Sequence, residues 1–261
     1  MKRIASLALI LILAVGISPV DASLIPPVMA NLPNVYSPNL NITLNTGRTA
    51  VHAFGNLDIQ GDTILLLDIS SSMKDQKRRP RPAPFTSMKQ AAILLCRTIL
   101  EDSDNRVAIV TFTTTPQLAS GFVDADGLNS LISVINGLKV RSRTKKDTNI
   151  DRAITAVDEF FDASSSAEER NIFVLTDGLP NVISPKRVRN SPGTPFAGSD
   201  HKHHREANTT VATFVSLHNK YNIYPIGFVH KTNAIVSSQL KNRDLAFIQK
   251  FLTEIATDEH P

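Results

Sequence analysis

The chain has 261 residues, of which 42% are hydrophobic and 20% charged, and its formal net charge is +4. These values are those of an ordinary globular protein and fit one sizeable domain with extensions. A single cysteine, Cys96, excludes an intrachain disulfide framework. Its place in an apolar helical pattern predicts a buried side chain rather than a reactive thiol.

The first residues have the pattern of a secretory signal peptide. Lys2 and Arg3 precede an apolar run over residues 4–17, and the small-residue pattern at 20–22 predicts cleavage after Ala22. The alternative is an uncleaved membrane anchor, but the run is shorter than the roughly 20 residues of a spanning helix. We therefore predict a secreted protein, extracellular or periplasmic, without stable membrane insertion after cleavage.

Residues 23–60 are expected to form an N-terminal extension, and residues 61–261 the main domain. Closely spaced prolines between Ser23 and Tyr36 predict a poorly structured leader. Residues 49–59 mix apolar and turn residues and fit an edge strand. The turn Gly61-Asp62 then marks the entry to the first central strand.

From Gly61 onward, apolar strand patterns alternate with amphipathic helix patterns. Residues 63–67 form an apolar run typical of a central strand covered on both faces. Ser87 and Gln90 have the spacing of a capping box that opens a helix. The alternation implies an α/β fold with a doubly wound, mostly parallel central sheet and helices on both faces. Further strands are expected at 106–112, 117–122, 171–176 and 222–229, and further helices at 126–138, 150–161, 205–219 and 240–255.

Polar oxygen donors follow two of these strands and precede one helix. Asp68, Ser70 and Ser72 end the first strand at alternate positions, which lets their side chains converge. Thr148 comes just before a helix, and Asp177 directly after a strand. Ligands of such sheets bind at the carboxyl ends of the strands, where these residues are expected. Carboxylate and hydroxyl oxygens suit Mg²⁺, Mn²⁺ or Ca²⁺ rather than zinc or copper.

The charge of this donor set has a consequence for binding. Two carboxylates only balance the charge of a divalent ion, so a coordination position left to water can accept an acidic group from a partner. The alternative is that Asp68 and Asp177 merely cap turns, with Thr148 as the N-cap of a helix.

Three motifs lie at strand or helix termini: Asp68-Ile-Ser70-Ser-Ser72, Thr148-Asn149-Ile150 and Leu175-Thr176-Asp177-Gly178-x-Pro180-Asn181. Together they resemble the metal-ion-dependent adhesion site of a von Willebrand factor type A domain. The resemblance covers about residues 61–255. It implies that Ser70, Ser72 and Thr148 are direct or near-direct metal ligands. It also implies that Asp68 and Asp177 bind directly or through the metal's waters, and that the metal holds a carboxylate offered by a protein partner.

The end of the chain departs from the family pattern. Members usually continue past the segment that corresponds to residues 251–257 into one more strand and a C-terminal helix, whereas this sequence stops at Pro261. Two explanations stay open. The product is truncated, or residues 49–59 fill the vacant sheet edge.

Basic loops and a histidine cluster are the remaining candidates. The loops at 74–81, 141–146 and 186–189 are expected at the metal's edge, where they would attract an acidic partner. The alternative is solvated loop charge, and no interleaved aromatic platform supports specific nucleic-acid binding. His201, His203 and His204 lie in a long loop. They serve a transition metal or a proton transfer, or belong to a mobile loop without such a role.

Three functions are compatible with these patterns. The leading hypothesis is a secreted adhesion or scaffolding module, not an enzyme, that binds an acidic macromolecular partner through a metal-bridged carboxylate. The rival is a hydrolase that uses the same metal as a Lewis acid, although the sequence has no Gly-x-Ser-x-Gly elbow. The third is a structural subunit that needs no metal.

Overall fold

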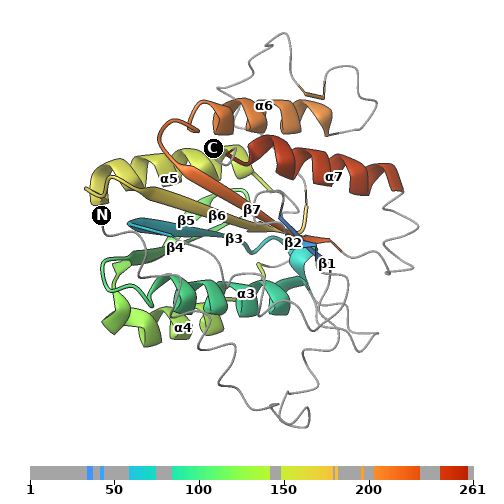
Figure 1. Ribbon diagram of the computed structural model, residues 1–261. Coiled ribbons are helices and arrows are strands. Elements are labelled where there is room, and N and C mark those ends of the chain that lie inside the picture. The colour runs from blue at the N-terminus through green and yellow to red at the C-terminus, as the bar shows by residue number, and fades with distance from the viewer. Residues whose placement is uncertain are drawn as a thin grey trace.

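The computed structural model describes residues 34–37, 42–43, 59–74, 84–141, 148–178, 180–181, 195–196, 203–229 and 242–257. These residues form a seven-stranded sheet flanked by helices (Figure 1). The strands are β1 (Asn34–Ser37), β2 (Ile42–Thr43), β3 (Asp62–Asp68), β4 (Arg106–Phe112), β5 (Pro116–Val123), β6 (Arg170–Thr176) and β7 (Asn222–Val229). The helices are α3 (Pro84–Ile99), α4 (Leu128–Gly137), α5 (Ile150–Ser164), α6 (His204–Val215) and α7 (Asn242–Ile255), with the 3₁₀ helices η3 (Ser71–Met73) and η4 (Ala125–Gly127).

Four parallel strands form the centre of the sheet, whose order is β2-β1-β7-β6-β3-β4-β5. β3 pairs with β4 on one side and with β6 on the other, and β6 pairs with β7. Every residue of β3 from Asp62 to Asp68 is buried, which explains its nearly continuous apolar sequence. β5 and β1 pair antiparallel at the two sides. The prediction of a mixed α/β fold with a mostly parallel sheet is confirmed.

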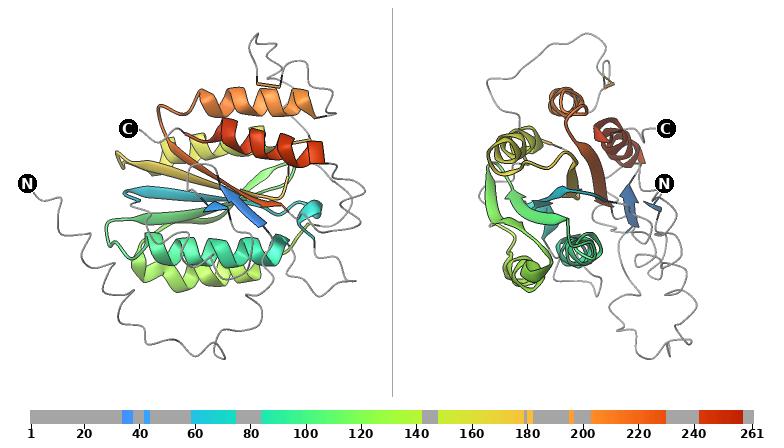
Figure 2. Two further views of the ribbon diagram at one scale, coloured as in Figure 1. Left: turned by 45° about the vertical axis from the view of Figure 1, so that its right-hand side comes forward. Right: turned by 60° about the vertical axis from the view of Figure 1, so that its left-hand side comes forward.

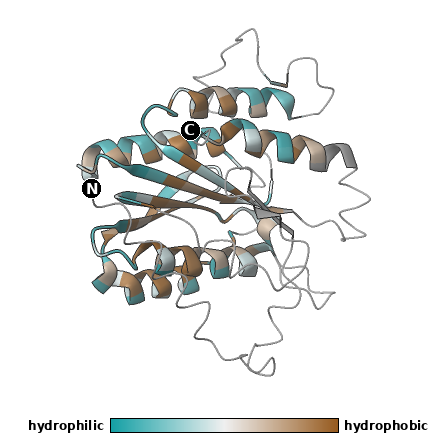
Figure 3. Ribbon diagram, in the orientation of Figure 1, coloured by the Kyte–Doolittle hydropathy of each residue, from teal (hydrophilic) through white to brown (hydrophobic). Residues whose placement is uncertain are grey.

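Alternate residues of β3 belong to two different hydrophobic cores. Ile64 and Leu66 pack in the core that contains α5, α6 and α7, whereas Leu65 and Leu67 pack in the core that contains α3 and α4. Figure 2 shows these two groups of helices on opposite sides of the sheet. Hydrophobic residues run along the central strands between them (Figure 3). The two cores together fix the position of β3 and of the residues at both of its ends.

An N-terminal strand occupies the edge of the sheet beside β7. Asn34 lies opposite Val229, and Tyr36 lies opposite Gly227. The expectation of a poorly structured leader up to Tyr36 is therefore wrong at its end. The segment expected to form the edge strand, residues 49–59, lies outside the described residues except for Ile59, which is in no strand. β1 instead provides partners for backbone groups of β7, which a sheet edge would otherwise leave unpaired.

The structure corrects the predicted start of α3 and the alternative N-cap of α5. α3 begins at Pro84, whose fixed φ and missing N–H suit a first helical position, so the capping box at Ser87 is wrong. Ser87 Oγ is buried and has no hydrogen-bond partner in the described part of the chain. The N-cap of α5 is Asn149, whose side chain accepts a hydrogen bond from the backbone N–H of Arg152. Thr148 is therefore not the N-cap.

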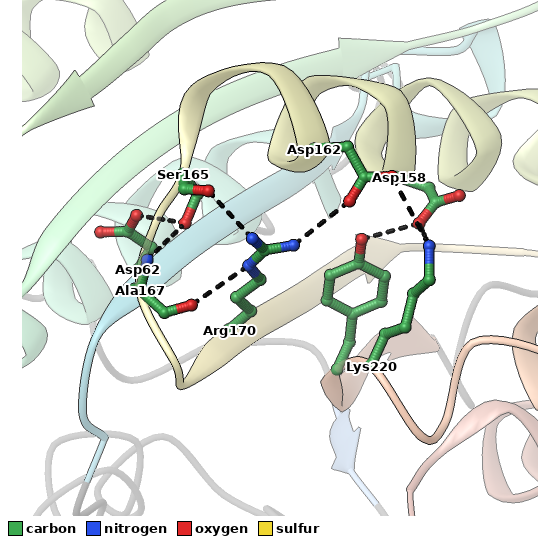
Figure 4. A network of polar contacts seen from close by, with 8 residues as sticks. Asp62, Asp158, Asp162, Ser165, Ala167, Arg170 and Lys220 are labelled. Atoms are coloured by element: carbon green, nitrogen blue, oxygen red, sulfur yellow. Dashed lines mark hydrogen bonds and ion pairs between the residues drawn. The ribbon is translucent and has the colours of Figure 1, made fainter.

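The amino ends of the strands carry a closed polar network. Arg106 donates to both carboxylate oxygens of Asp62, at 2.8 and 2.5 Å, and Ser165 Oγ donates to Asp62 at 2.5 Å. Arg170 donates to the Ser165 carbonyl and to Asp162 (Figure 4). The buried carboxylate of Asp62 thus has an arginine as its counter-charge.

The predicted signal peptide, residues 1–22, lies outside the described residues. Within the described ranges, no helix is long and apolar enough to cross a membrane.

Removal of β1 is expected to destabilise the sheet and expose the edge of β7. A chain that starts at Thr49 loses the β1–β7 hydrogen bonds, each worth about 1 kcal/mol, and presents an unpaired edge that favours self-association. Its melting temperature should be lower than that of a chain from Ser23, and sedimentation should show concentration-dependent oligomers. Equal melting temperatures and a monomeric short chain would contradict the pairing.

Candidate metal site

The polar residues that follow β3 fold back on one another. Asp68 is fully buried, and its Oδ1 accepts a hydrogen bond from the Ser70 backbone N–H at 2.8 Å. Ser70 Oγ lies 2.8 Å from Ser72 Oγ. Ser72 belongs to η3, which is anchored by the buried side chain of Met73. The three residues therefore converge at the end of the strand.

β6 brings the second carboxylate to the same place. Ser72 Oγ donates a hydrogen bond to Asp177 Oδ1 at 2.9 Å. Thr176 Oγ1 donates to Asp68 Oδ2 at 2.7 Å. Because β3 and β6 are parallel neighbours, their carboxyl ends meet at one edge of the sheet. Hydrogen bonds thus link Asp68, Ser70, Ser72 and Asp177 in one chain.

Thr148 is buried just before α5 and is held by its backbone. Its N–H donates to Asn181 Oδ1 at 2.7 Å, and its carbonyl accepts from the Asn181 N–H at 3.1 Å. The next N–H, that of Asn149, donates to the carbonyl of Thr113 at 2.9 Å. Within the described residues, no hydrogen bond joins the Thr148 side chain to the other four predicted ligands. The structure anchors Thr148 to the segment that follows Asp177.

Burial and mutual repulsion disfavour the charged forms of Asp68 and Asp177. Burial raises the pKa of Asp68 above its ordinary value. Burial, and then the charge of Asp68, raise the pKa of Asp177 to about 7. Among the residues that the structure describes, no lysine or arginine forms an ion pair with either carboxylate. This differs from Asp62 at the opposite end of β3, which Arg106 neutralises.

The donor set fits a hard divalent cation. Carboxylates and hydroxyls are the oxygen ligands that Mg²⁺ and Ca²⁺ take in proteins. In the described part of the chain, no three His, Cys, Asp or Glu side chains gather, so the set has two carboxylates and neutral oxygens only. A cation at this edge would supply the positive charge that the neighbouring side chains do not.

One residue of the predicted basic loops lies next to this site: the backbone N–H of Arg141 donates to the carbonyl of Ile69, in the turn that follows β3, at 3.1 Å. The basic loops lie outside the described residues apart from Lys74 and Arg141, which are exposed. Arg141 donates a hydrogen bond to the side chain of Gln117. His201 also lies outside the described residues, whereas His203 precedes α6 and His204 opens it.

All five predicted ligands fall within one family match. Residues 63–179 match the family model of the von Willebrand factor type A (vWA) domain. This segment begins in β3 and ends just beyond Asp177. The match and the fold support a vWA domain in this chain. No curated protein matches the chain in sequence.

The chain is similar to several solved structures at low sequence identity, and the two with a TM-score above 0.5 share its fold. The PilB minor pilin from Streptococcus sanguinis has a TM-score of 0.53 and 18% identity, over 77% of this chain and 55% of that chain. A point mutant of PilB has the same TM-score at 16% identity, over 78% of this chain and 57% of that one. Proximal thread matrix protein 1 from the mussel byssus has a TM-score of 0.49 and 17% identity, over 77% of this chain and 41% of that chain. This chain spans about half the length of the pilin chains.

Two residues near the site were not predicted to contribute to it. Thr176 and Asn181 both lie in the motif at 175–181, but the sequence alone gave neither of them a role. Their partners, Asp68 and Thr148, are 108 and 33 residues away along the chain. A hydroxyl directly before the acid that ends a buried strand is the signal by which Thr176 could have been found.

The pKa of Asp177 predicts how stability changes with pH in the absence of metal. The value is about 7 in the folded state and 3.8 ordinarily, so the folded state binds the extra proton between these values. The free energy of unfolding should therefore fall as pH rises from about 4 to about 7. In EDTA, the melting temperature of the parent should fall more steeply across this range than that of Asp177→Asn, which has no proton to lose at this position. Equal slopes would contradict the assignment.

Proposed function

We propose that this chain is a secreted binding module whose vWA domain holds Mg²⁺, or Mn²⁺ or Ca²⁺, through Asp68, Ser70, Ser72, Thr148 and Asp177. The site binds an Asp or Glu carboxylate presented by a protein partner. The observation that carries this proposal is the pair of carboxylates of Asp68 and Asp177. Hydrogen bonds through Ser70 and Ser72 link them, and neither has a cationic partner among the described residues. A bound divalent cation supplies that charge and a coordination position for a ligand.

The charge of the site favours an acidic ligand. Two ionised carboxylates balance a divalent cation, and the hydroxyls of Ser70, Ser72 and Thr148 add no charge. Because this chain supplies only two of the acidic ligands, a carboxylate from a partner can replace a water on the cation. Four of the five donors lie at the carboxyl ends of β3 and β6 or in the turns that follow them, so loops rather than buried strands surround the ligand.

Three further observations support a secreted module for adhesion or scaffolding. The sequence of residues 1–22 has the pattern of a signal peptide. PilB, which shares the fold, is a minor pilin. The family match spans the whole set of proposed ligands.

The rival function, a metal-dependent hydrolase, has no support of the same kind. Asp124 and Asp126 are both exposed. Asp124 Oδ1 accepts a hydrogen bond from the Asp126 backbone N–H at 3.1 Å, as the N-cap of η4. Both acids therefore belong to an exposed turn.

Titration calorimetry with Mg²⁺ and Mn²⁺ tests the metal site directly. The mature chain from Ser23 should bind one ion, and Asp68→Ala should bind at least about 100-fold more weakly, because it loses a charged ligand. Asp162→Ala removes an exposed acid near the other end of the sheet and should bind like the parent. Mg²⁺ should also raise the melting temperature of the parent and of Asp162→Ala, but not that of Asp68→Ala. A folded parent that binds neither ion would overturn the proposed function.

Immobilised peptides test the preference for a carboxylate. In Mg²⁺, the chain should bind peptides rich in Glu and Asp more tightly than matched peptides with Gln and Asn, and EDTA should abolish the difference. Asp177→Ala should lose this Mg²⁺-dependent binding while remaining folded. A structural subunit that needs no metal predicts instead that Asp177→Ala binds its partners unchanged.

A further inference from the structure

Asn181 and Thr148 form a reciprocal pair of hydrogen bonds. The Asn181 side chain accepts from the Thr148 N–H at 2.7 Å, and the Asn181 N–H donates to the Thr148 carbonyl at 3.1 Å. Both backbone groups of Thr148 are therefore bound by a single residue. Asn181 stands four positions after Asp177. The pair thus joins the segment that carries one proposed ligand to the residue that is another.

These hydrogen bonds join two segments that are not neighbours in the sheet. Thr148 precedes α5, and Asn181 follows β6. The carbonyl of Thr113, just beyond β4, accepts the next N–H, that of Asn149. β4 and β6 lie on opposite sides of β3. The bond to Thr113 therefore ties the start of α5 to the β4 side, whereas the bonds to Asn181 tie Thr148 to the side that carries Asp177.

We propose that Asn181 is a positioning residue of the metal site, which sets the place of Thr148 relative to Asp177. The inference rests on the proposed function, because it concerns the same five ligands. Thr148 is only 4% exposed, so its N–H needs an acceptor from the protein. The N-cap role at α5 is filled by Asn149, which leaves the Thr148 hydroxyl available as a ligand.

The chemistry of the side chain explains why an asparagine suits this position. Its carbonyl oxygen accepts the Thr148 N–H while its own backbone N–H reaches the Thr148 carbonyl. Leucine has nearly the same shape but no acceptor, so it would leave the N–H unpaired. Aspartate keeps an acceptor at the same place. Comparison of these two substitutions therefore isolates the hydrogen bond from the shape of the side chain.

The test measures Mg²⁺ affinity in the full mature chain. Asn181→Leu should weaken binding about 10- to 100-fold, the usual effect of removing a group that orients a metal ligand. Asn181→Asp should bind at least as tightly as the parent. The matched control is Asn171→Leu at the opposite end of β6, where the buried Asn171 donates to the Gln60 carbonyl at 2.8 Å. It should lower the melting temperature but leave the affinity within about twofold.

A second background distinguishes positioning from a general effect on the fold. If Asn181 acts through Thr148, then Asn181→Leu should weaken Mg²⁺ binding little further once Thr148→Val has removed the hydroxyl. Additive losses would overturn the inference, and so would an Asn181→Leu variant with parental affinity. If Asn181→Leu does not fold, Asn181→Ala replaces it in both comparisons. A folded parent without Mg²⁺ affinity overturns the proposed function instead, so the two failures are distinct.

Discussion

The burial of β3 is the constraint on which the rest of the structure depends. This strand begins and ends with a buried aspartate, Asp62 and Asp68, because both faces of the sheet are covered. A buried carboxylate needs hydrogen bonds and a counter-charge. Asp62 obtains both from Arg106 and Ser165. Asp68 obtains only hydrogen bonds from its described neighbours. The carboxylate at one end of β3 is thus neutralised by an arginine, whereas the carboxylate at the other end has no cationic side chain beside it among the described residues. The proposed metal ligands gather at this second end.

The outer strands support this end of the sheet indirectly. Asp177 follows β6, whose position depends on β3 on one side and on β7 on the other. β7 in turn is covered by β1 from the N-terminal extension. The extension therefore contributes to the same sheet as the site, although it lies far from it in sequence. On the other side, β5 covers β4 with irregular register, as is common at the edge of a sheet.

Much of this arrangement could be predicted from the sequence because it follows from periodicity. Continuous apolar runs identified the central strands, and the rule that parallel strands end at one edge brought Asp68 and Asp177 together before any contact was known. The failures have physical reasons. β1 is short and lies among prolines, so it has no strand pattern of its own, and its partner β7 is almost two hundred residues away. At the start of α5, both Thr148 and Asn149 are residue types that cap helices, and Asn, the better of the two, is the N-cap. The hydrogen bonds of Thr148 with Asn181 join segments on different sides of α5, and the sequence pattern contains no signal for such a contact.

Hydrogen bonds and a raised pKa explain how the fold tolerates the proximity of Asp68 and Asp177. The raised pKa of Asp177, about 7, means that a proton is retained near neutral pH when no cation is present. A proton and a divalent cation are therefore alternative ways to reduce the same repulsion between Asp68 and Asp177. The hydroxyls of Ser72 and Thr176 donate to these carboxylates without a metal. These bonds hold both carboxylates in place with the protein's own groups. A divalent cation at the proposed site would displace this proton, and it would meet carboxylates that hydrogen bonds already hold in place.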